Sequence, residues 1–280
     1  MHAPFGLSTH LFHDQRLGRE HLDAIAAHGF DGIELFATRT HFDYHDRAAA
    51  DALAGWLEAT GLRLYSVHAP IVTGYTDGVW GAPLSTATSD AAARGRALDE
   101  ARAALALART VPFRHLVVHL GQPDERQPPA GDNSRDAARR SVEQLHEAAT
   151  AVGVRLALEV IPNRISTPEA LVRLLDDLEL KDAGVCLDFG HAFLGGDLVD
   201  AIEELSGVLV ATHVHDNRGK SDDHLAPFEG RIDWEQALFA CQKVGYEGVW
   251  TLELANTSTP AAVLARAREA CARFREILAS

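Results

Sequence analysis

Histidine and carboxylate side chains are concentrated in one stretch, residues 212–234, that follows an apolar run at residues 207–211. Such side chains in this stretch include His213, His215, Asp216, Asp222, Asp223, His224 and Glu229. Imidazoles and carboxylates just past a strand end are common ligands of divalent cations. A solvated acidic loop would explain the aspartates. It would not explain two histidines that emerge from an apolar strand, so a metal site is the favoured interpretation.

Similar groups recur near the ends of other predicted strands. They are Glu34, His68, His119, Glu159, Asp188, His191 and Glu253. In a closed barrel of parallel strands, the carboxyl ends of all strands meet at one mouth. Burying so many charged groups without partners would be costly, so we expect them to bind cations or to pair with one another.

Eight short apolar runs alternate with amphipathic segments along the chain. The runs, interpreted as strands, cover residues 5–9, 32–37, 62–68, 113–120, 154–161, 184–189, 207–215 and 248–254. Helices are expected at residues 19–28, 47–60, 90–110, 134–152, 198–205, 233–244 and 259–278, with one more that opens at Thr167-Pro168. Ser134 and Thr167 are expected to cap their helices.

This alternation predicts an α/β fold, a (β/α)₈ TIM barrel in which residues 1–280 form a single domain. Apolar strands without strict alternation suit a parallel sheet that is buried on both faces. A doubly wound open sheet is the alternative, but no glycine-rich phosphate loop follows the first strand. Long loops at residues 69–89 and 121–133 should overhang the active face as lids.

Composition restricts the class of protein. The chain has 280 residues, 46% of them hydrophobic and 24% charged, as in ordinary globular proteins. A net charge of −14 argues against a nucleic-acid partner, because phosphate contacts need a basic face. Three cysteines without paired spacing indicate a reducing compartment. Residues 1–10 contain no signal peptide and no apolar run spans a membrane, so we expect a cytoplasmic protein without a membrane partner.

Short motifs on the successive predicted strands resemble those of the xylose isomerase-like barrel superfamily, which includes endonuclease IV and the tagatose/psicose-type sugar epimerases. The motifs are His68-Ala-Pro70, His119-Leu-Gly121, Leu158-Glu-Val160, Asp188-Phe-Gly-His191, His213-Val-His-Asp-Asn217, Asp222-Asp-His224, Glu229-Gly230 and Leu252-Glu-Leu254. The resemblance covers nearly the whole chain. In this order the motifs are specific for the superfamily but not for a substrate.

The resemblance to the epimerases implies one divalent ion, held by Glu159, Asp188, His213 and Glu253. Three carboxylates around one ion suit Mn²⁺ or Mg²⁺ as well as Zn²⁺. The resemblance also implies that Glu159 and Glu253 face a substrate carbon from opposite sides as catalytic base and acid. The alternative is that both glutamates only hold the metal.

The resemblance to endonuclease IV implies three ions instead of one. The further ligands would be His68 and His119 for one ion, and His191, Asp222 and His224 for another, with Glu159 as the bridge. Such a cluster would make the protein a zinc phosphoesterase. The acidic net charge and the absence of basic, DNA-intercalating loops argue against a DNA-repair role. Phe228 also replaces an expected glycine, and a ring there would narrow the mouth for a small substrate.

Further residues are candidates for contact with the substrate. They are His10, Glu34, His215, Arg218 and Trp234, and Trp80 is a second tryptophan with a possible sugar-stacking face. If strand alternation holds, His215 shares a face with His213. Each candidate also has a plain structural interpretation, because tryptophans often only pack and an arginine often only balances an acidic loop.

The leading hypothesis is a metal-dependent isomerase or epimerase of a small sugar or related polyol ketone. The cofactor would be one to three divalent ions (Mn²⁺, Zn²⁺ or Mg²⁺), and the partner a small sugar-like molecule. A zinc phosphoesterase is the second hypothesis, and a non-catalytic sugar-binding barrel is the third. A homodimer is possible within the superfamily, but the sequence identifies no interface.

Overall fold

Eight parallel strands close a barrel in the computed structural model, which describes residues 3–279. The strands are β1 (Phe5–Ser8), β2 (Gly32–Phe36), β3 (Arg63–His68), β6 (His115–Val118), β7 (Arg155–Glu159), β8 (Gly184–Asp188), β9 (Leu209–Val214) and β10 (Trp250–Leu252). Their order around the barrel is β1-β10-β9-β8-β7-β6-β3-β2. The predicted (β/α)₈ architecture is confirmed; Met1, His2 and Ser280, at the ends of the predicted domain, lie outside the described residues.

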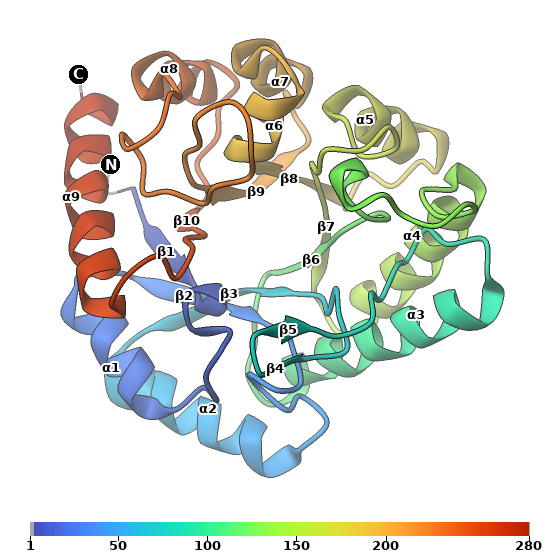
Figure 1. The fold of residues 1–280 in the computed structure, drawn as a ribbon, viewed down its shortest axis with the longest axis horizontal. Coiled ribbons are helices and arrows are strands. Elements are labelled where there is room, and N and C mark those ends of the chain that lie inside the picture. Colours follow the sequence, from blue (N-terminus) through green and yellow to red (C-terminus); the bar gives the residue numbers. More distant parts are fainter. Residues whose placement is uncertain (1–2, 280) are drawn as a thin grey trace.

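Helices surround the barrel (Figure 1). They are α1 (Arg19–Ala27), α2 (Arg47–Thr60), α3 (Ala91–Leu105), α4 (Arg135–Thr150), α5 (Pro168–Asp177), α6 (Phe189–Gly195), α7 (Leu198–Glu204), α8 (Trp234–Lys243) and α9 (Pro260–Leu278). Two expected caps are present: the Ser134 side chain accepts from Ala137 N, and the Thr167 side chain accepts from Ala170 N. Because each cap satisfies a backbone donor, these helices begin where the sequence predicts.

The register between adjacent strands places residues of the upper barrel end side by side. Asp188 on β8 pairs with His213 on β9, and Phe36 on β2 pairs with His68 on β3. Both strand pairs contain a register shift, between Val185 and Cys186 and between Ile33 and Glu34. Each shift lies between the second and third residues of a five-residue strand, and the register downstream of it sets the level of the residues at the strand end.

Two elements were not predicted. The short helix α6 begins directly after β8, and the Asp188 carboxylate caps it by accepting from His191 N at 2.7 Å. Gly190 and Gly195 make that segment resemble a loop in the sequence. The hairpin of β4 (Tyr75–Thr76) and β5 (Val79–Trp80) lies inside the predicted loop at residues 69–89.

Apolar side chains fill the space between the barrel and the helices. Leu7 and Ile33 on the strands and Leu22 and Ile25 on α1 are fully buried in one core. Within residues 3–279, no helix has both the length and the apolar character needed to cross a membrane.

His41, in the loop after β2, is completely buried next to the β1–α1 segment. Its Nδ1 donates to the Gln15 carbonyl at 2.7 Å, and its Nε2 has no hydrogen-bond partner. Burial lowers the pKa of His41 from 6.5 to about 4, although the Gln15 carbonyl favours the charged form. The ring is therefore neutral in the folded protein at neutral pH.

This burial predicts a pH-dependent stability. The folded-state pKa lies below the unfolded value, so the contribution of His41 is complete above pH 6.5 and is lost as the pH falls towards 4. Between pH 7 and pH 5 this one group should lower the free energy of unfolding by about 2 kcal/mol. His41→Asn keeps a donor for Gln15 but cannot titrate. Urea denaturation should show a smaller loss from pH 7 to pH 5 in this variant, and equal losses in both proteins would contradict the assignment.

Candidate metal centre and active site

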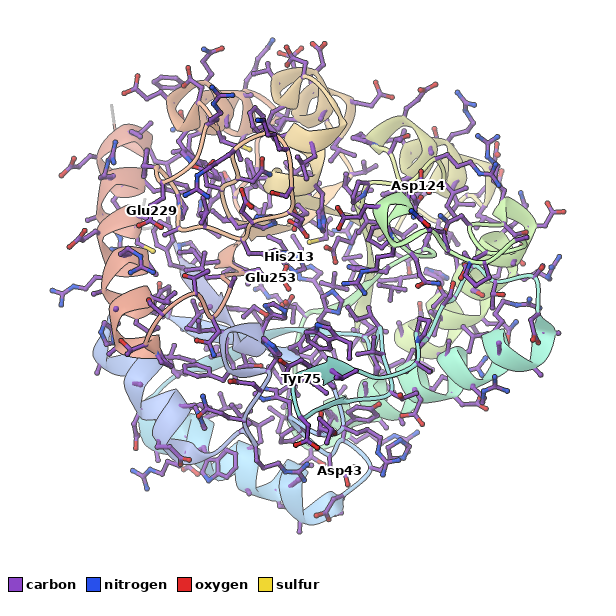
Figure 2. The ribbon with its side chains drawn as sticks, in the orientation of Figure 1. Asp43, Tyr75, Asp124, His213, Glu229 and Glu253 are labelled. Atoms are coloured by element: carbon purple, nitrogen blue, oxygen red, sulfur yellow. The ribbon has the colours of Figure 1, made fainter. Side chains whose placement is uncertain are left out.

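Four acidic or imidazole side chains converge at the carboxyl ends of adjacent strands. Glu159 ends β7, Asp188 ends β8, His213 lies one residue before the end of β9, and Glu253 follows β10. All four are buried, and their ligand atoms lie within 4.8 Å of one another. Figure 2 shows His213 and Glu253 near the centre of the ring, with Asp43, Asp124 and Glu229 farther out. This is the set that the resemblance to the epimerases implies.

The Nδ1 atom of His213 faces three carboxylates. It lies 3.2 Å from Glu159 Oε1, 3.2 Å from Glu253 Oε2 and 3.9 Å from Asp188 Oδ2. This nitrogen is buried and has no hydrogen-bond partner. A buried lone pair beside three carboxylate oxygens is the donor set that a divalent cation uses, so the residues present fit the predicted metal.

The opposite side of the His213 ring is fixed by Glu34. Nε2 of His213 donates to Glu34 Oε2 at 3.1 Å, and the Ser66 hydroxyl donates to the same oxygen at 2.8 Å. A proton held on Nε2 leaves Nδ1 free to face the cluster. Glu34 thus orients the predicted ligand rather than facing the pocket.

The carboxylates around Nδ1 of His213 favour a positive charge at this atom. Burial opposes a charge on His213, but Cys186, Glu34, Glu159 and Glu253 outweigh it and raise its pKa well above the usual value. Burial likewise disfavours the Glu159 carboxylate, yet His119 and His213 hold its pKa well below the usual range. A bound cation would neutralise the surrounding carboxylates in the same way as a proton on His213.

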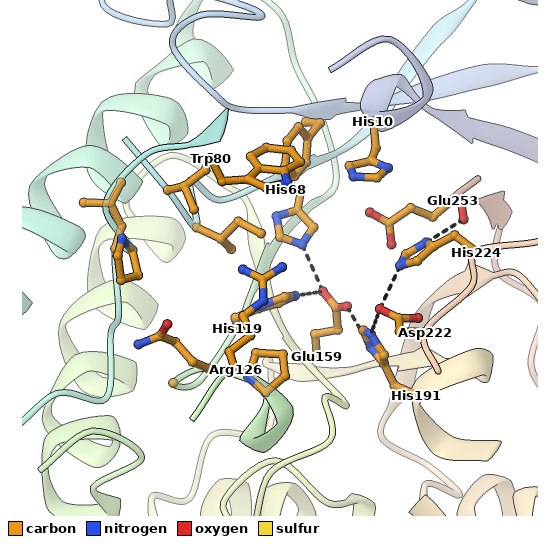
Figure 3. Close-up of a pocket in the computed structure, with 18 residues that line it drawn as sticks. His10, His68, Trp80, His119, Arg126, Glu159, His191, Asp222, His224 and Glu253 are labelled. Atoms are coloured by element: carbon orange, nitrogen blue, oxygen red, sulfur yellow. Dashed lines mark hydrogen bonds and ion pairs between the residues drawn. The ribbon is translucent and has the colours of Figure 1, made fainter. Parts of the chain in front are cut away.

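His68 and His119 approach Glu159 from the other side. Each places Nε2 3.1 Å from Glu159 Oε2, as Figure 3 shows. Nδ1 of His68 donates to the Ala69 carbonyl at 2.8 Å, which fixes the ring. Burial opposes protonation of His68, but Glu159 outweighs it and raises the pKa to about 9. Glu159 therefore faces His213 through Oε1 and both His68 and His119 through Oε2, as a bridging ligand would.

A second cluster contains His191, His215, Asp222 and His224. Nε2 of His191 and Nε2 of His224 each lie 3.1 Å from Asp222 Oδ2. Their Nδ1 atoms donate to the backbone carbonyls of Val160 and Glu253, respectively. This pattern, with one nitrogen anchored and the other facing a carboxylate, is typical of metal-binding histidines.

His215 belongs to this second cluster, whereas the sequence predicted a substrate contact. Its Nε2 lies 2.9 Å from Asp188 Oδ1, and its ring stacks on His224 at 3.9 Å between centroids. Strand β9 ends at Val214, so alternation no longer places His215 beside His213. A Cβ on Gly190 would meet the His215 ring, which explains why the turn into α6 carries a glycine here.

The loop that carries Asp222 and His224 is anchored by Asp216, which is completely buried. Its carboxylate accepts from the backbone N–H groups of four loop residues and from one indole. The donors are Asn217, Phe228, Arg231, Ile232 and Nε1 of Trp234. So many donors to one carboxylate fix the path of the loop and hold the second cluster in place.

A pocket opens above these clusters (Figure 3). His10 and Trp80 line it, as the sequence predicted, together with Phe36, Gln122 and Arg126, which sequence reasoning missed. These three lie on β2 and in the 121–133 loop, where neither the spacing nor the type of residue indicates that a side chain faces the mouth.

Two predicted substrate contacts lie elsewhere. Trp234 is 2% exposed at the start of α8, and its Nε1 donates to Asp216, so it anchors the loop and does not line the pocket. The Arg218 side chain is 62% exposed and lies 3.8 Å from Asp223, outside the pocket lining. The Phe228 ring packs on Trp234 and Phe274 and does not narrow the mouth.

Comparison with known proteins gives relatives of the same architecture. Fructoselysine 3-epimerase of Escherichia coli O157:H7 is 27% identical over 273 residues, which cover 94% of this chain and 95% of the relative. An uncharacterized protein of Methanocaldococcus jannaschii is 26% identical and covers 90% of this chain and 84% of its own length. A crystal structure of a D-tagatose 3-epimerase-like protein superposes with a TM-score of 0.80 at 25% identity, covering 99% of this chain and 98% of the other.

Residues 22–277 match the xylose isomerase-like TIM barrel family. The match spans most of the chain and includes every strand end that contributes to the clusters. The chain therefore belongs to the xylose isomerase-like TIM barrel family.

Proposed function

We propose that the protein is a divalent-metal-dependent isomerase or epimerase of a small ketose or related polyol ketone. The observation that carries the proposal is the buried, unpartnered Nδ1 of His213, with Glu159 and Glu253 each 3.2 Å away. Related proteins of near-complete coverage are sugar epimerases, which supports an enzyme of this type. The substrate would be small, because the pocket ends on these buried groups.

Metal binding would fall to Glu159, Asp188, His213 and Glu253. When bound there, a divalent cation would supply Lewis-acid polarisation of a carbonyl and the hydroxyl beside it, which would acidify the hydrogen on the hydroxyl-bearing carbon. The chain contributes the orientation of the donors: Glu34 fixes His213, and the cap of α6 fixes Asp188. Mn²⁺, Mg²⁺ and Zn²⁺ all suit this set of donors.

Proton transfer would fall to the two glutamates. His119 and His213 keep Glu159 ionised, so its carboxylate can accept the proton from the substrate carbon. The electron pair of that bond moves to the carbonyl oxygen and gives an enediolate. Glu253, which must start this step protonated, would then deliver its proton to the opposite face of the carbon while the electron pair returns from the oxygen, so that the configuration is inverted and Glu159 is left protonated and Glu253 ionised. In the reverse direction the two glutamates exchange roles.

The walls of the pocket would bind the rest of the sugar. Trp80 and Phe36 present aromatic surface, and aromatic rings stack on the apolar faces of sugars. His10 lies between them and His224, with ring centroids 4.9 Å from Phe36 and 5.5 Å from His224. A hydroxyl-rich ketone would therefore meet apolar surface on one side and the charged clusters on the other.

The second cluster favours one other candidate, a zinc phosphoesterase with up to three ions. His191, Asp222 and His224 would hold a further ion, and His68 and His119 another, with Glu159 as the bridge. The relatives reported above do not support this activity, whereas the clusters themselves are compatible with it. The number of bound ions distinguishes the two candidates.

Substitution of either glutamate tests the catalytic assignment. Glu159→Gln and Glu253→Gln keep the side-chain shape but remove the base or acid, so turnover of ketoses should fall by about 10²–10⁴-fold. Exchange of the substrate carbon-bound hydrogen with deuterium from D₂O measures the step directly. Glu58→Gln on the exposed face of α2 is the matched control and should leave the rate unchanged. Full exchange in both active-site variants would remove them as acid and base.

Metal analysis of the purified protein tests the number of ions. We expect about one divalent ion per chain by mass spectrometry, and its loss in His213→Gln, because that change removes the nitrogen donor. His28→Gln, at the C-cap of α1, is the control and should retain the ion. About three ions together with hydrolysis of phosphodiesters would favour the phosphoesterase. Activity that persists after complete removal of metal would contradict both candidates.

A further inference from the structure

A second cavity lies at the opposite end of the barrel, where the parallel strands begin. It is lined by the first residues of three strands, His115 of β6, Arg155 of β7 and Leu209 of β9. Its volume is about 570 Å³, which is in the range of small-molecule sites. The opening exposes part of β9 from Leu209 to Ala211, although barrel strands are normally buried.

Small side chains create this space. Ser66, Ala211 and Thr251 line the cavity at positions where a barrel normally holds bulky branched residues. Gly153 and Gly248 also line the cavity and contribute no side chain to it. Small residues at these positions leave the space open.

The charges that face this cavity are mainly positive. Arg114, Arg155 and His115 line it, and Glu247, which is exposed, is the one carboxylate in the lining. Within residues 3–279 neither guanidinium forms an ion pair. Arg155 donates from one terminal nitrogen to the Ala183 carbonyl at 2.9 Å, while its buried Nε has no partner.

The positive field acts on the neighbouring imidazole. Burial first, and then the charges of Arg155 and Arg114, lower the pKa of His115 to about 4. Like charges that share a site repel one another, and the Asp182 carboxylate acts on Arg155 without forming an ion pair, so a bound anion would stabilise the arrangement. It stands out in a chain whose net charge is −14.

A thin apolar layer separates this cavity from the metal centre. Val117, Ala157 and Cys186 form a small buried cluster of their own, distinct from the main core. Cys186 reaches the upper site, because its pKa responds to His213 and Glu159. The two sites therefore occupy opposite ends of one barrel. Ser66 contributes to both, because it lines the lower cavity and donates to Glu34, whereas Arg114, His115 and Arg155 belong to the lower end alone.

We propose that the lower cavity, defined by Arg114, His115 and Arg155, is a binding site for a phosphate group, free or carried by a small metabolite. Guanidinium groups match phosphate oxygens in geometry and charge. Each guanidinium carries five N–H donors, and of those on Arg155 only one terminal nitrogen is bonded, to the Ala183 carbonyl, so donors remain for a phosphate. The imidazole of His115 provides a second type of hydrogen bond. This inference does not depend on the reaction proposed for the upper site.

Binding of inorganic phosphate to the full-length, metal-loaded protein tests the proposal. Isothermal titration, with sulfate as a second dianion and chloride at equal ionic strength as the control, should show saturable phosphate binding. The imidazole resonances of His115 should shift with the same saturation. Phosphate attached to a small alcohol should bind as well if the source is a metabolite, and only free phosphate should bind if the ligand is the inorganic ion.

Variants assign the binding to one end of the barrel. Arg155→Gln and Arg114→Gln should each weaken phosphate binding at least about tenfold, because each removes a charge-assisted donor. Arg114 is exposed, so its variant should fold even if that of Arg155 does not. Glu247→Gln should tighten binding, because it removes the competing carboxylate.

Two controls complete the experiment. Arg96→Gln, an exposed arginine on α3, should leave phosphate binding unchanged. His213→Gln should also retain it, because the upper site is not involved. Binding that is lost in His213→Gln and kept in the Arg114 and Arg155 variants would place phosphate at the metal centre and overturn the proposal, as would a complete absence of saturable binding.

Discussion

The upper end of the barrel depends on one electrostatic constraint: three carboxylates share a buried space with a single nitrogen lone pair. Glu159, Asp188 and Glu253 each have an oxygen within 4 Å of His213 Nδ1. Water is excluded from these groups, so their mutual repulsion is weakly screened. The arrangement is stable only with positive charge at its centre, supplied by a proton or by a metal ion. The surrounding hydrogen bonds serve to keep that centre in place.

Barrel geometry produces this convergence from residues far apart in the sequence. Hydrogen-bonded register aligns Asp188 with His213, and His213 in turn with Thr251, two residues before Glu253. Side chains two residues apart on a strand point to the same face. Adjacent strands therefore deliver their last inward-facing side chains to a common level. A shift of one residue in β9 would turn His213 outwards and remove the only nitrogen from this group of four.

Much of this could be predicted from the sequence, because strand ends and inward-facing residues follow from periodicity. The predicted ligands lie near the ends of the apolar runs that form the strands. They are Glu159, Asp188, His213 and Glu253. Trp234 was misplaced for a physical reason: its position next to an acidic loop resembles a pocket wall, but its indole N–H is needed by the buried Asp216. Such pairing between residues 18 positions apart depends on the loop path, which no local pattern encodes.

The side chains that the loops contribute to the pocket were equally difficult to predict from the sequence. Arg126 lies in a short 3₁₀ turn within the 121–133 loop, and the hairpin that holds Trp80 depends on a turn at Asp77 and Gly78 with positive φ angles of 51° and 81°. The Asp-Gly pair is a known signal for such a turn. It was overlooked because the surrounding strands have only two residues each. Short elements carry too little periodicity to be separated from a loop.

The two ends of the barrel carry opposite charge, and the direction of the parallel strands explains part of this. Helices that follow each strand begin at the upper end, so their N–H groups favour carboxylates there, as the cap from Asp188 to His191 illustrates. Helices finish at the lower end, and the carbonyl of Ala183, in the loop between α5 and β8, accepts from Arg155 there. A helix terminus offsets only a fraction of a unit charge. The Ala183 carbonyl and the Asp182 carboxylate, which acts on Arg155 without forming an ion pair, stabilise that arginine in part. Among the described residues Arg114 has no ion pair, which is the physical reason to look for an anion between the two guanidinium groups.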